Sequence, residues 1–265
     1  MRVLVTGSSR GIGRATTLEF AGRGHHVIAT ARTPGTPAGH GVAECLQLDV
    51  TDTESVARAA ARTGPIDVLV NGAGAPLVSS PVETHPLADL KEQLDVNYLG
   101  PVRMIQAFLP AMRERGSGTI VNVGSVTGRV AQPLRGAANA SKFALEGMSE
   151  ALKYETGHFG IRVILVEPGA TQNQPGKVKY ALPGRAPHYA DLFTQFEAAE
   201  KGLTASVALL TPDLVAKAIA DAVESKDAPF RLTLGGDAEL VLAERKRSTD
   251  EDFEARMRSL LGITW

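Results

Sequence analysis

Short apolar runs alternate with longer segments of helical spacing along the chain. Most of the seven runs are continuously apolar at their centres, which is typical of strands covered on both faces. The segments between them space apolar residues as helices do, for example at Leu90 and Leu94. Strands that alternate with helices predict an α/β fold: one doubly wound parallel sheet of about seven strands, with helices on both faces, spanning residues 1–265. The runs occupy residues 2–7, 26–31, 44–50, 66–72, 118–124, 161–169 and 230–236.

Two segments depart from this alternation. Residues 172–210 begin with a stretch rich in proline and glycine, continue into a short helical pattern and end before a helix that Thr211 and Pro212 start. The segment follows a strand end, where α/β enzymes place substrate loops, although a surface connection would have a similar composition. The C-terminal extension, about 237–265, is predicted to form a charged helix. That helix could cover a substrate cleft, form an oligomer contact or project into solvent.

The balance of charge excludes partners held by bulk electrostatics. The 265 residues include 28 Lys and Arg against 29 Asp and Glu, a formal net charge of −1, so we expect neither a nucleic-acid nor a membrane partner. The single cysteine, Cys45, forms no internal disulfide, and the six histidines lack metal-ligand spacing, so no metal site is expected. With no leader and no apolar run of membrane length, we expect a cytoplasmic protein.

A glycine-rich turn, TGSSRGIG (6–13), joins the first predicted strand to the first predicted helix. Gly7, Gly11 and Gly13 let the backbone approach a pyrophosphate, while the helix N-terminus supplies free N–H groups and a partial positive charge. An NAD enzyme usually carries an acidic residue about 20 residues further on, but this chain has Arg32 there, with Arg10 inside the turn. Two guanidinium groups suit a 2′-phosphate, so the pattern predicts NADP(H).

Six segments, in this order, resemble the short-chain dehydrogenase/reductase family: TGSSRGIG, LDVTD (48–52), VNGAGA (70–75), LDVNYLG (94–100), VNVGSVTG (121–128) and VEPGATQN (166–173). The resemblance implies that Asp49 binds the adenine amino group. The chain departs from the family's NNAG motif at Gly72, which replaces the second Asn. VEPGATQN resembles the family's turn beside the nicotinamide, where a Thr is common five residues after the proline; that residue is Asn173 here, so Thr171 is expected to make the contact instead. The cofactor residues implied are Gly7, Ser9, Arg10, Gly11, Ile12, Gly13, Arg32, Asp49, Val50, Asn71, Gly72, Ala73, Lys142, Pro168, Gly169 and Thr171.

The same resemblance places Asn97, Ser125 and Lys142 in a catalytic group, but the family's catalytic Tyr, four residues before the lysine, is Ala138 here. In the family that Tyr moves the proton, the lysine lowers its pKa and binds the nicotinamide ribose, the serine binds the substrate oxygen and the asparagine holds a water. Three interpretations stay open. The chain is an NADP(H)-dependent ketone reductase or alcohol dehydrogenase disarmed by replacement of its Tyr, a natural relative with Tyr-independent chemistry such as elimination, isomerisation or cyclisation, or a protein that only binds NADP(H).

The family also guides the expected substrate and assembly. ASKFALEGMSEAL resembles reductases of steroids, retinoids and polyketides, which indicates a small, apolar carbonyl or alcohol substrate. Family members pair through the helices that carry Asn97 and Ala138–Lys142. We therefore expect a homo-dimer or homo-tetramer. These helices carry more apolar residues than one core-facing stripe needs, and the additional ones are Phe108, Leu109, Met148 and Leu152.

Overall fold

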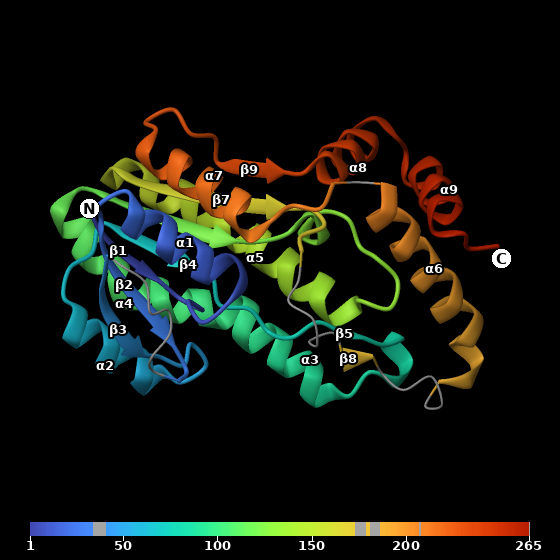
Figure 1. Cartoon of the computed structure of the whole chain (residues 1–265), viewed down its shortest axis with the longest axis horizontal. Helices are drawn as coiled ribbons and strands as arrows, with labels where there is room; N and C mark the ends of the chain where they lie inside the picture. The colour runs from blue at the N-terminus through green and yellow to red at the C-terminus, as the bar shows by residue number, and fades with distance from the viewer. Residues whose placement is uncertain (34–40, 173–178, 181–185, 207, 265) are drawn as a thin grey trace.

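The computed structural model describes residues 1–33, 41–172, 179–180, 186–206 and 208–264. Its main element is a seven-stranded sheet in the order β3-β2-β1-β4-β6-β7-β9, in which every neighbouring pair is parallel (Figure 1). All seven predicted strands are therefore confirmed, as is the doubly wound α/β fold. The strands are β1 (Arg2–Val5), β2 (His26–Ala31), β3 (Val42–Gln47), β4 (Val68–Asn71), β6 (Gly118–Val123), β7 (Ile161–Pro168) and β9 (Arg231–Leu234).

The order of the strands creates a crevice at one edge of the sheet. From β1 the chain builds outward through β2 to β3, and then returns to the other side of β1 for β4, β6, β7 and β9. The connections leaving β1 and β4 therefore diverge at the carboxyl ends of these two strands. In open parallel sheets such a reversal is where ligands bind, because the diverging connections leave the strand ends uncovered.

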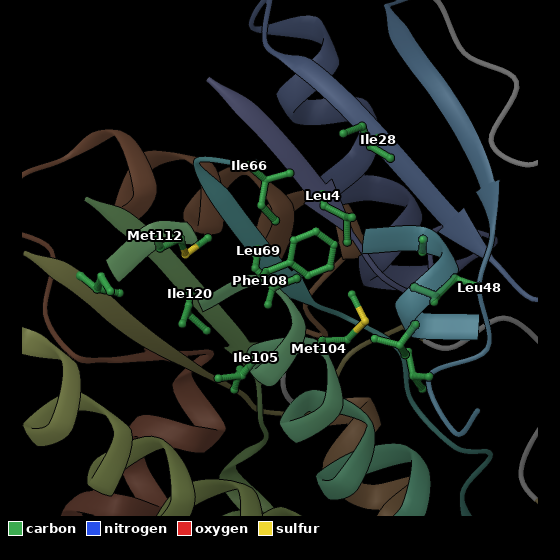
Figure 2. Packing of buried hydrophobic residues seen from close by; sticks show 14 of the residues in the cluster. Leu4, Ile28, Leu48, Ile66, Leu69, Met104, Ile105, Phe108, Met112 and Ile120 are labelled. Carbon is green, nitrogen blue, oxygen red and sulfur yellow. The ribbon is translucent and has the colours of Figure 1, made fainter. Parts of the chain in front are cut away.

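Successive side chains of a strand enter different cores, because they point to opposite faces of the sheet. On β1, Leu4 packs with Phe108 of α4 (Gly100–Arg115) and with residues of α2 (Thr53–Thr63), as Figure 2 shows for Leu4 and Phe108. Val3 and Val5 pack on the other face with Phe20 of α1 (Gly11–Gly22) and with α7 (Pro212–Glu224). The double coverage that the apolar runs predicted is thus confirmed.

The long helix α5 (Gly136–Thr156) lies on the same face as α4 and contributes Leu152 to that core. Phe108 and Leu152, which we expected to be available for a subunit contact, are buried there with 4% and 6% of their surface exposed. That part of the expectation is wrong, because the apolar stripe toward the sheet is wider than one row of residues. Leu109 and Met148 are partly buried against the same core.

Short elements connect the main ones at the carboxyl edge of the sheet. A π-helical turn, Asp95–Leu99, joins α3 (Leu87–Leu94) to α4, and β5 (Val78–Ser79) pairs in parallel with β8 (Lys179–Tyr180). Turns of 3₁₀ helix occupy Val82–Thr84, Val126–Gly128, Gly157–Phe159 and Pro187–Tyr189.

The C-terminal extension forms two helices instead of the single one expected. They are α8 (Gly236–Arg247) and α9 (Asp250–Leu261), and α9 packs against α6 (Ala190–Ser206) (Figure 1). The break occurs because Ser248 is extended and the Thr249 side chain accepts a hydrogen bond from Asp252 N, which starts a new helix. Ion pairs between Arg245 and Asp250 and between Arg256 and Glu244 link the two helices.

Candidate active site

A cavity of about 1100 Å³ opens where the strand order reverses, between the turns that follow β1, β2, β4 and β6. Most of the residues expected to bind the cofactor contribute to its walls, whereas Asn71, Pro168 and Gly169 do not. The structure therefore brings most of the predicted cofactor residues together around one cavity. The expected residues in the lining are Gly7, Ser9, Arg10, Gly11, Ile12, Gly13, Arg32, Asp49, Val50, Gly72, Ala73, Lys142 and Thr171.

The glycine-rich turn is packed so tightly at Gly7 and Gly13 that side chains would not fit there. Gly7 has a φ of +73°, and a Cβ atom there would lie 2.7 Å from Ala73 Cα. A Cβ atom at Gly13 would lie 2.8 Å from the carbonyl carbon of Gly7. The Thr6 hydroxyl accepts hydrogen bonds from Gly72 N and Ala73 N, at 3.0 and 3.1 Å, which fastens the turn after β4 to the end of β1. The cavity is thus bordered by bare backbone at the start of α1, as a bound pyrophosphate requires.

Charged groups line the wall of the cavity beyond β2 and β3. The Asp49 carboxylate accepts hydrogen bonds from Thr51 N and Thr51 Oγ1 at 2.9 and 2.7 Å. Burial raises the pKa of Asp49, but these bonds and the charges of Arg32 and Arg103 outweigh it and hold the pKa below its usual range. Arg32 is exposed and Arg10 half-buried, and both line the cavity. This end of the cavity therefore carries a fixed anion beside two cations.

Asn71 has a place in the interior of the sheet. Its amide donates to Asn122 Oδ1 at 2.8 Å, and the Asn122 amide in turn donates to Ser149 Oγ at 2.9 Å. Asn71 and Asn122 are paired across β4 and β6, so this buried chain of hydrogen bonds ties both strands to α5. Any contribution of Asn71 to a cofactor site would be through the position of the residues that follow it.

Asn97 sits on the π-helical turn, where its side chain is 4% exposed. Its Oδ1 accepts from Ala75 N at 3.0 Å, and its amide donates to Gln93 Oε1 at 2.9 Å and to Ser141 Oγ at 3.0 Å. Both amide hydrogens are therefore used inside the protein. Gln93 was missed by sequence reasoning, although its spacing of four residues before Asn97 places it on the same side of a helix.

Ser125 follows β6 and caps the next 3₁₀ turn. Its hydroxyl accepts from Thr127 N and Thr127 Oγ1, at 3.2 and 3.0 Å, and lies 3.5 Å from Pro168 O, to which it donates. Ser125 is half-buried, and the Pro168 contact brings the end of β6 next to the turn after β7. Thr127 was not singled out from the sequence.

Lys142 and Ala138 lie one turn apart on α5. Lys142 donates from Nζ to Val123 O at 2.8 Å and lines the cavity, and burial lowers the pKa of this ammonium group to about 8. Ala138 presents a methyl group, which can neither donate nor accept a proton. Ser141, the nearest hydroxyl on the helix, donates to Ala138 O at 2.8 Å and is buried. The structure therefore offers no hydroxyl on this turn that is free to replace a tyrosine.

The segment expected to form a substrate loop partly folds into α6, which is attached to the start of α5. Arg135 forms an ion pair with Glu200, and its guanidinium lies 5.2 Å from the ring centroid of Phe196. Tyr189 donates its hydroxyl to Glu83 Oε2 at 2.6 Å, and this hydrogen bond raises the pKa of Tyr189. The Tyr189 hydroxyl is thereby engaged with Glu83. Residues 173–178 and 181–185, including Asn173, lie outside the described residues.

A buried charge cluster lies beside the turn after β7 and was not found from the sequence. Glu167 is fully buried between Arg129 (3.1 Å), Arg231 (3.6 Å) and the Thr233 hydroxyl (2.8 Å). Arg231 also contacts Glu146 at 3.2 Å and the exposed Glu150 at 2.7 Å. These residues are far apart along the chain, which is why only the fold reveals them. Burial and the neighbouring Glu167 raise the pKa of Glu146 to about 8, against the lowering effect of Arg231.

Comparison with known proteins identifies the family. The family model for short chain dehydrogenases matches residues 1–179, which include the glycine-rich turn, Asn97, Ser125 and Lys142. The chain belongs to the short-chain dehydrogenase family. The resemblance drawn from six short motifs is thereby confirmed at the level of the family, a family of oxidoreductases.

Similar short-chain dehydrogenases are known by sequence and by structure. The 3-ketodihydrosphingosine reductase of Bacteroides thetaiotaomicron is 34% identical over 251 residues, covering 92% of this chain and 91% of that protein. A short-chain dehydrogenase from Streptomyces avermitilis has a TM-score of 0.83 at 33% identity, covering 99% of this chain and 98% of the other. A short chain dehydrogenase from Burkholderia cenocepacia J2315 in complex with NADP has a TM-score of 0.76 at 26% identity and covers 100% and 98%.

Two further observations concern the part of the chain that the structure describes. None of its helices is long and apolar enough to cross a membrane. In the same residues, His, Cys, Asp and Glu side chains nowhere gather in groups of three or more that could hold a metal ion.

Proposed function

We propose that this short-chain dehydrogenase binds NADP(H) and is built to interconvert a ketone and a secondary alcohol, but lacks its proton-transferring tyrosine. The observation that carries the proposal is the vacancy at Ala138, one helical turn before Lys142, among residues that otherwise match the family's site. The cavity of about 1100 Å³, the bare backbone of its glycine-rich turn and the NADP-bound relative from Burkholderia cenocepacia support the choice of cofactor.

The roles of the chain's own residues follow from their places. The pyrophosphate would lie on the N-terminal backbone of α1, and Asp49 would accept from the adenine amino group. Lys142 would donate to the nicotinamide ribose. Ser125, half-buried at the end of β6, would turn its hydroxyl from Pro168 O to donate to the substrate oxygen. The cofactor supplies the hydride chemistry. The missing part is a group at residue 138 that gives the substrate oxygen its proton.

The two other interpretations stay open beside this one. A natural, Tyr-independent chemistry is favoured by one observation: Lys142, with a pKa lowered to about 8, lines the cavity and titrates close to neutral pH. A protein that only binds NADP(H) would need the same cavity and no proton donor. The substrate proposed for the first interpretation is a small, apolar carbonyl or alcohol, which the name of the relative from Bacteroides thetaiotaomicron, a keto-compound reductase, supports.

The cofactor proposal predicts tighter binding of NADPH than of NADH. Arg32 and Arg10 line one end of the cavity and could contact a 2′-phosphate. Arg32→Ala is expected to weaken NADPH binding about tenfold or more, the effect of one charge-assisted hydrogen bond, and to leave NADH binding unchanged. Isothermal titration calorimetry with both nucleotides measures this. Arg14→Ala is the control, since Arg14 is exposed on α1 and does not line the cavity. Equal affinity for the two nucleotides in the unaltered chain would refute the preference.

Assembly is proposed to use the outer face of α5. Phe143 and Tyr154 are 44% and 72% exposed, and their spacing of eleven residues places them on the same side of the helix, three turns apart. We expect light scattering to give the mass of a dimer or tetramer, and Phe143→Asp to shift it toward the monomer. Leu240→Asp is the control, because Leu240 is 73% exposed on α8. A monomer mass for the unaltered chain would contradict the proposal.

A further inference from the structure

The carboxylate of Asp237 occupies a cradle between two glycines. Asp237 lies in the first turn of α8, and its Oδ2 accepts a hydrogen bond from Ala170 N at 2.7 Å. A Cβ atom built on Gly169 would lie 2.5 Å from Oδ2 and nearer still to Oδ1, and the three atoms nearest to it all belong to Asp237. Gly235, at a φ of +102°, lies on the other side of the carboxylate, and a Cβ atom there would be 2.7 Å from Oδ1. The side chain of Asp237 thus fills the space that side chains at both glycines would need.

This cradle fixes one side of the turn that follows β7. The other side is held by Leu210, whose backbone donates to Ala170 O at 3.0 Å and accepts from Gln172 N at 2.8 Å. Between these anchors, Thr171 bonds to Gly169 O at 3.1 Å and lines the cavity together with Gln172. The Ala170 amide is therefore one residue away from the cavity wall, and its position sets where Thr171 lies.

We propose that Asp237 is a positioning residue for the nicotinamide end of the cofactor site, through which the C-terminal helices become part of that site. Its carboxylate orients the Gly169–Thr171 turn without contacting the ligand. The inference rests on the proposed binding of NADP(H). It extends the site beyond residues 1–179, which the family model matches, because α8 lies outside that range.

The proposal is tested by comparing the binding of NADPH with the binding of a ligand that contains only its adenine end. Adenosine 2′,5′-bisphosphate carries the adenine end of NADPH and lacks the nicotinamide end. Asp237→Ala is expected to weaken NADPH binding about tenfold or more in calorimetric titration, the effect of losing a hydrogen bond to a charged group, and to leave binding of the bisphosphate unchanged. Asp237→Asn keeps an acceptor oxygen in the cradle and is expected to retain most of the affinity. A residue with a merely structural role would weaken both ligands alike, and that result would overturn the proposal.

Two further measurements test the contact between Asp237 and the Gly169–Thr171 turn directly. Gly169→Ala places a methyl group against the Asp237 carboxylate, so it is expected to weaken NADPH binding, and the double variant with Asp237→Ala is expected to bind NADPH more tightly than Gly169→Ala alone. In the ligand-free chain, Asp237→Ala is expected to speed hydrogen exchange at the amide of Ala170, which loses its acceptor.

The exchange measurement does not depend on the cofactor, so the two proposals can fail separately. Exchange at Ala170 that is unchanged in Asp237→Ala would overturn the positioning role, whatever the chain binds. Failure of the unaltered chain to bind NADPH would overturn the proposed function and, with it, the cofactor part of this inference.

Discussion

Ala138→Tyr is expected to raise the rate of NADPH-dependent carbonyl reduction by about 10²–10⁴, the usual contribution of a positioned general acid. The new phenol would stand one turn before Lys142 on α5, so the two side chains would share a face. A cation about 4 Å away contributes about 4 kcal/mol at an effective dielectric near 20, or about three pKa units. That would bring a tyrosine of ordinary pKa near 10 close to neutrality.

The measurement is the absorbance of NADPH over a panel of ketones, for both forms of the protein. Ala138→Phe is the matched control, because it fills the same space with a ring that has no hydroxyl. Activity that appears with Tyr and stays low with Phe supports proton transfer as the missing function. Some activity of the unaltered chain is expected, since a water beside the Ala138 methyl group could carry the proton.

Two results would favour the other interpretations. If the unaltered chain already turns over its substrate rapidly and Ala138→Tyr abolishes this, the chain uses a natural, Tyr-independent chemistry. If both forms bind NADPH and neither turns over any carbonyl or alcohol of the panel, the chain is better described as a protein that binds the nucleotide as a ligand.

The buried charge cluster predicts that the free energy of unfolding falls as the pH rises from about 5 to about 8. The pKa of Glu146 is raised to about 8 in the folded protein, from an ordinary value of 4.5. Its protonated form is therefore favoured by folding, so this contribution is complete below pH 4.5 and is lost as the pH passes through 8. The loss is at most about 1.4 kcal/mol per pH unit, because one proton is involved.

Burial of Glu146 and then the charges around it explain the direction. Arg129 and Arg231 supply two positive charges to the carboxyl groups of Glu146, Glu150 and Glu167. A proton on Glu146 balances the cluster, whereas its loss adds a third negative charge in a buried position, close to Glu167.

Urea unfolding of the unaltered chain and of Glu146→Gln between pH 5 and 8.5 tests this. The amide resembles the protonated acid, so the variant is expected to show a flatter pH dependence and to be the more stable form at pH 8.5. Glu150→Gln is the matched control: it removes the same charge from the same Arg231 partner, but at a side chain that is 48% exposed. A Glu146→Gln variant that keeps the full pH dependence would refute the assignment.

The sequence by itself determined the fold and the place of the cavity at the carboxyl edge of the sheet. The seven strands and their flanking helices followed from apolar periodicity, because a strand buried on both faces and a helix buried on one leave different patterns. The glycine-rich turn, Arg10, Arg32 and Lys142 were found because they lie within short continuous motifs, and the structure places all of them around one cavity.

What only the tertiary structure decided are the contacts between residues that no motif joins. The surroundings of Glu167, the cradle of Asp237 and the attachment of α6 through Arg135 each bring together side chains from distant segments. Phe108 and Leu152 were assigned to a subunit surface, because an apolar residue has the same appearance in the sequence whether a sheet or another protein covers it. Burial and hydrogen-bond geometry depend on how the elements pack, and a periodic pattern specifies which side of a helix is apolar without specifying what lies against it.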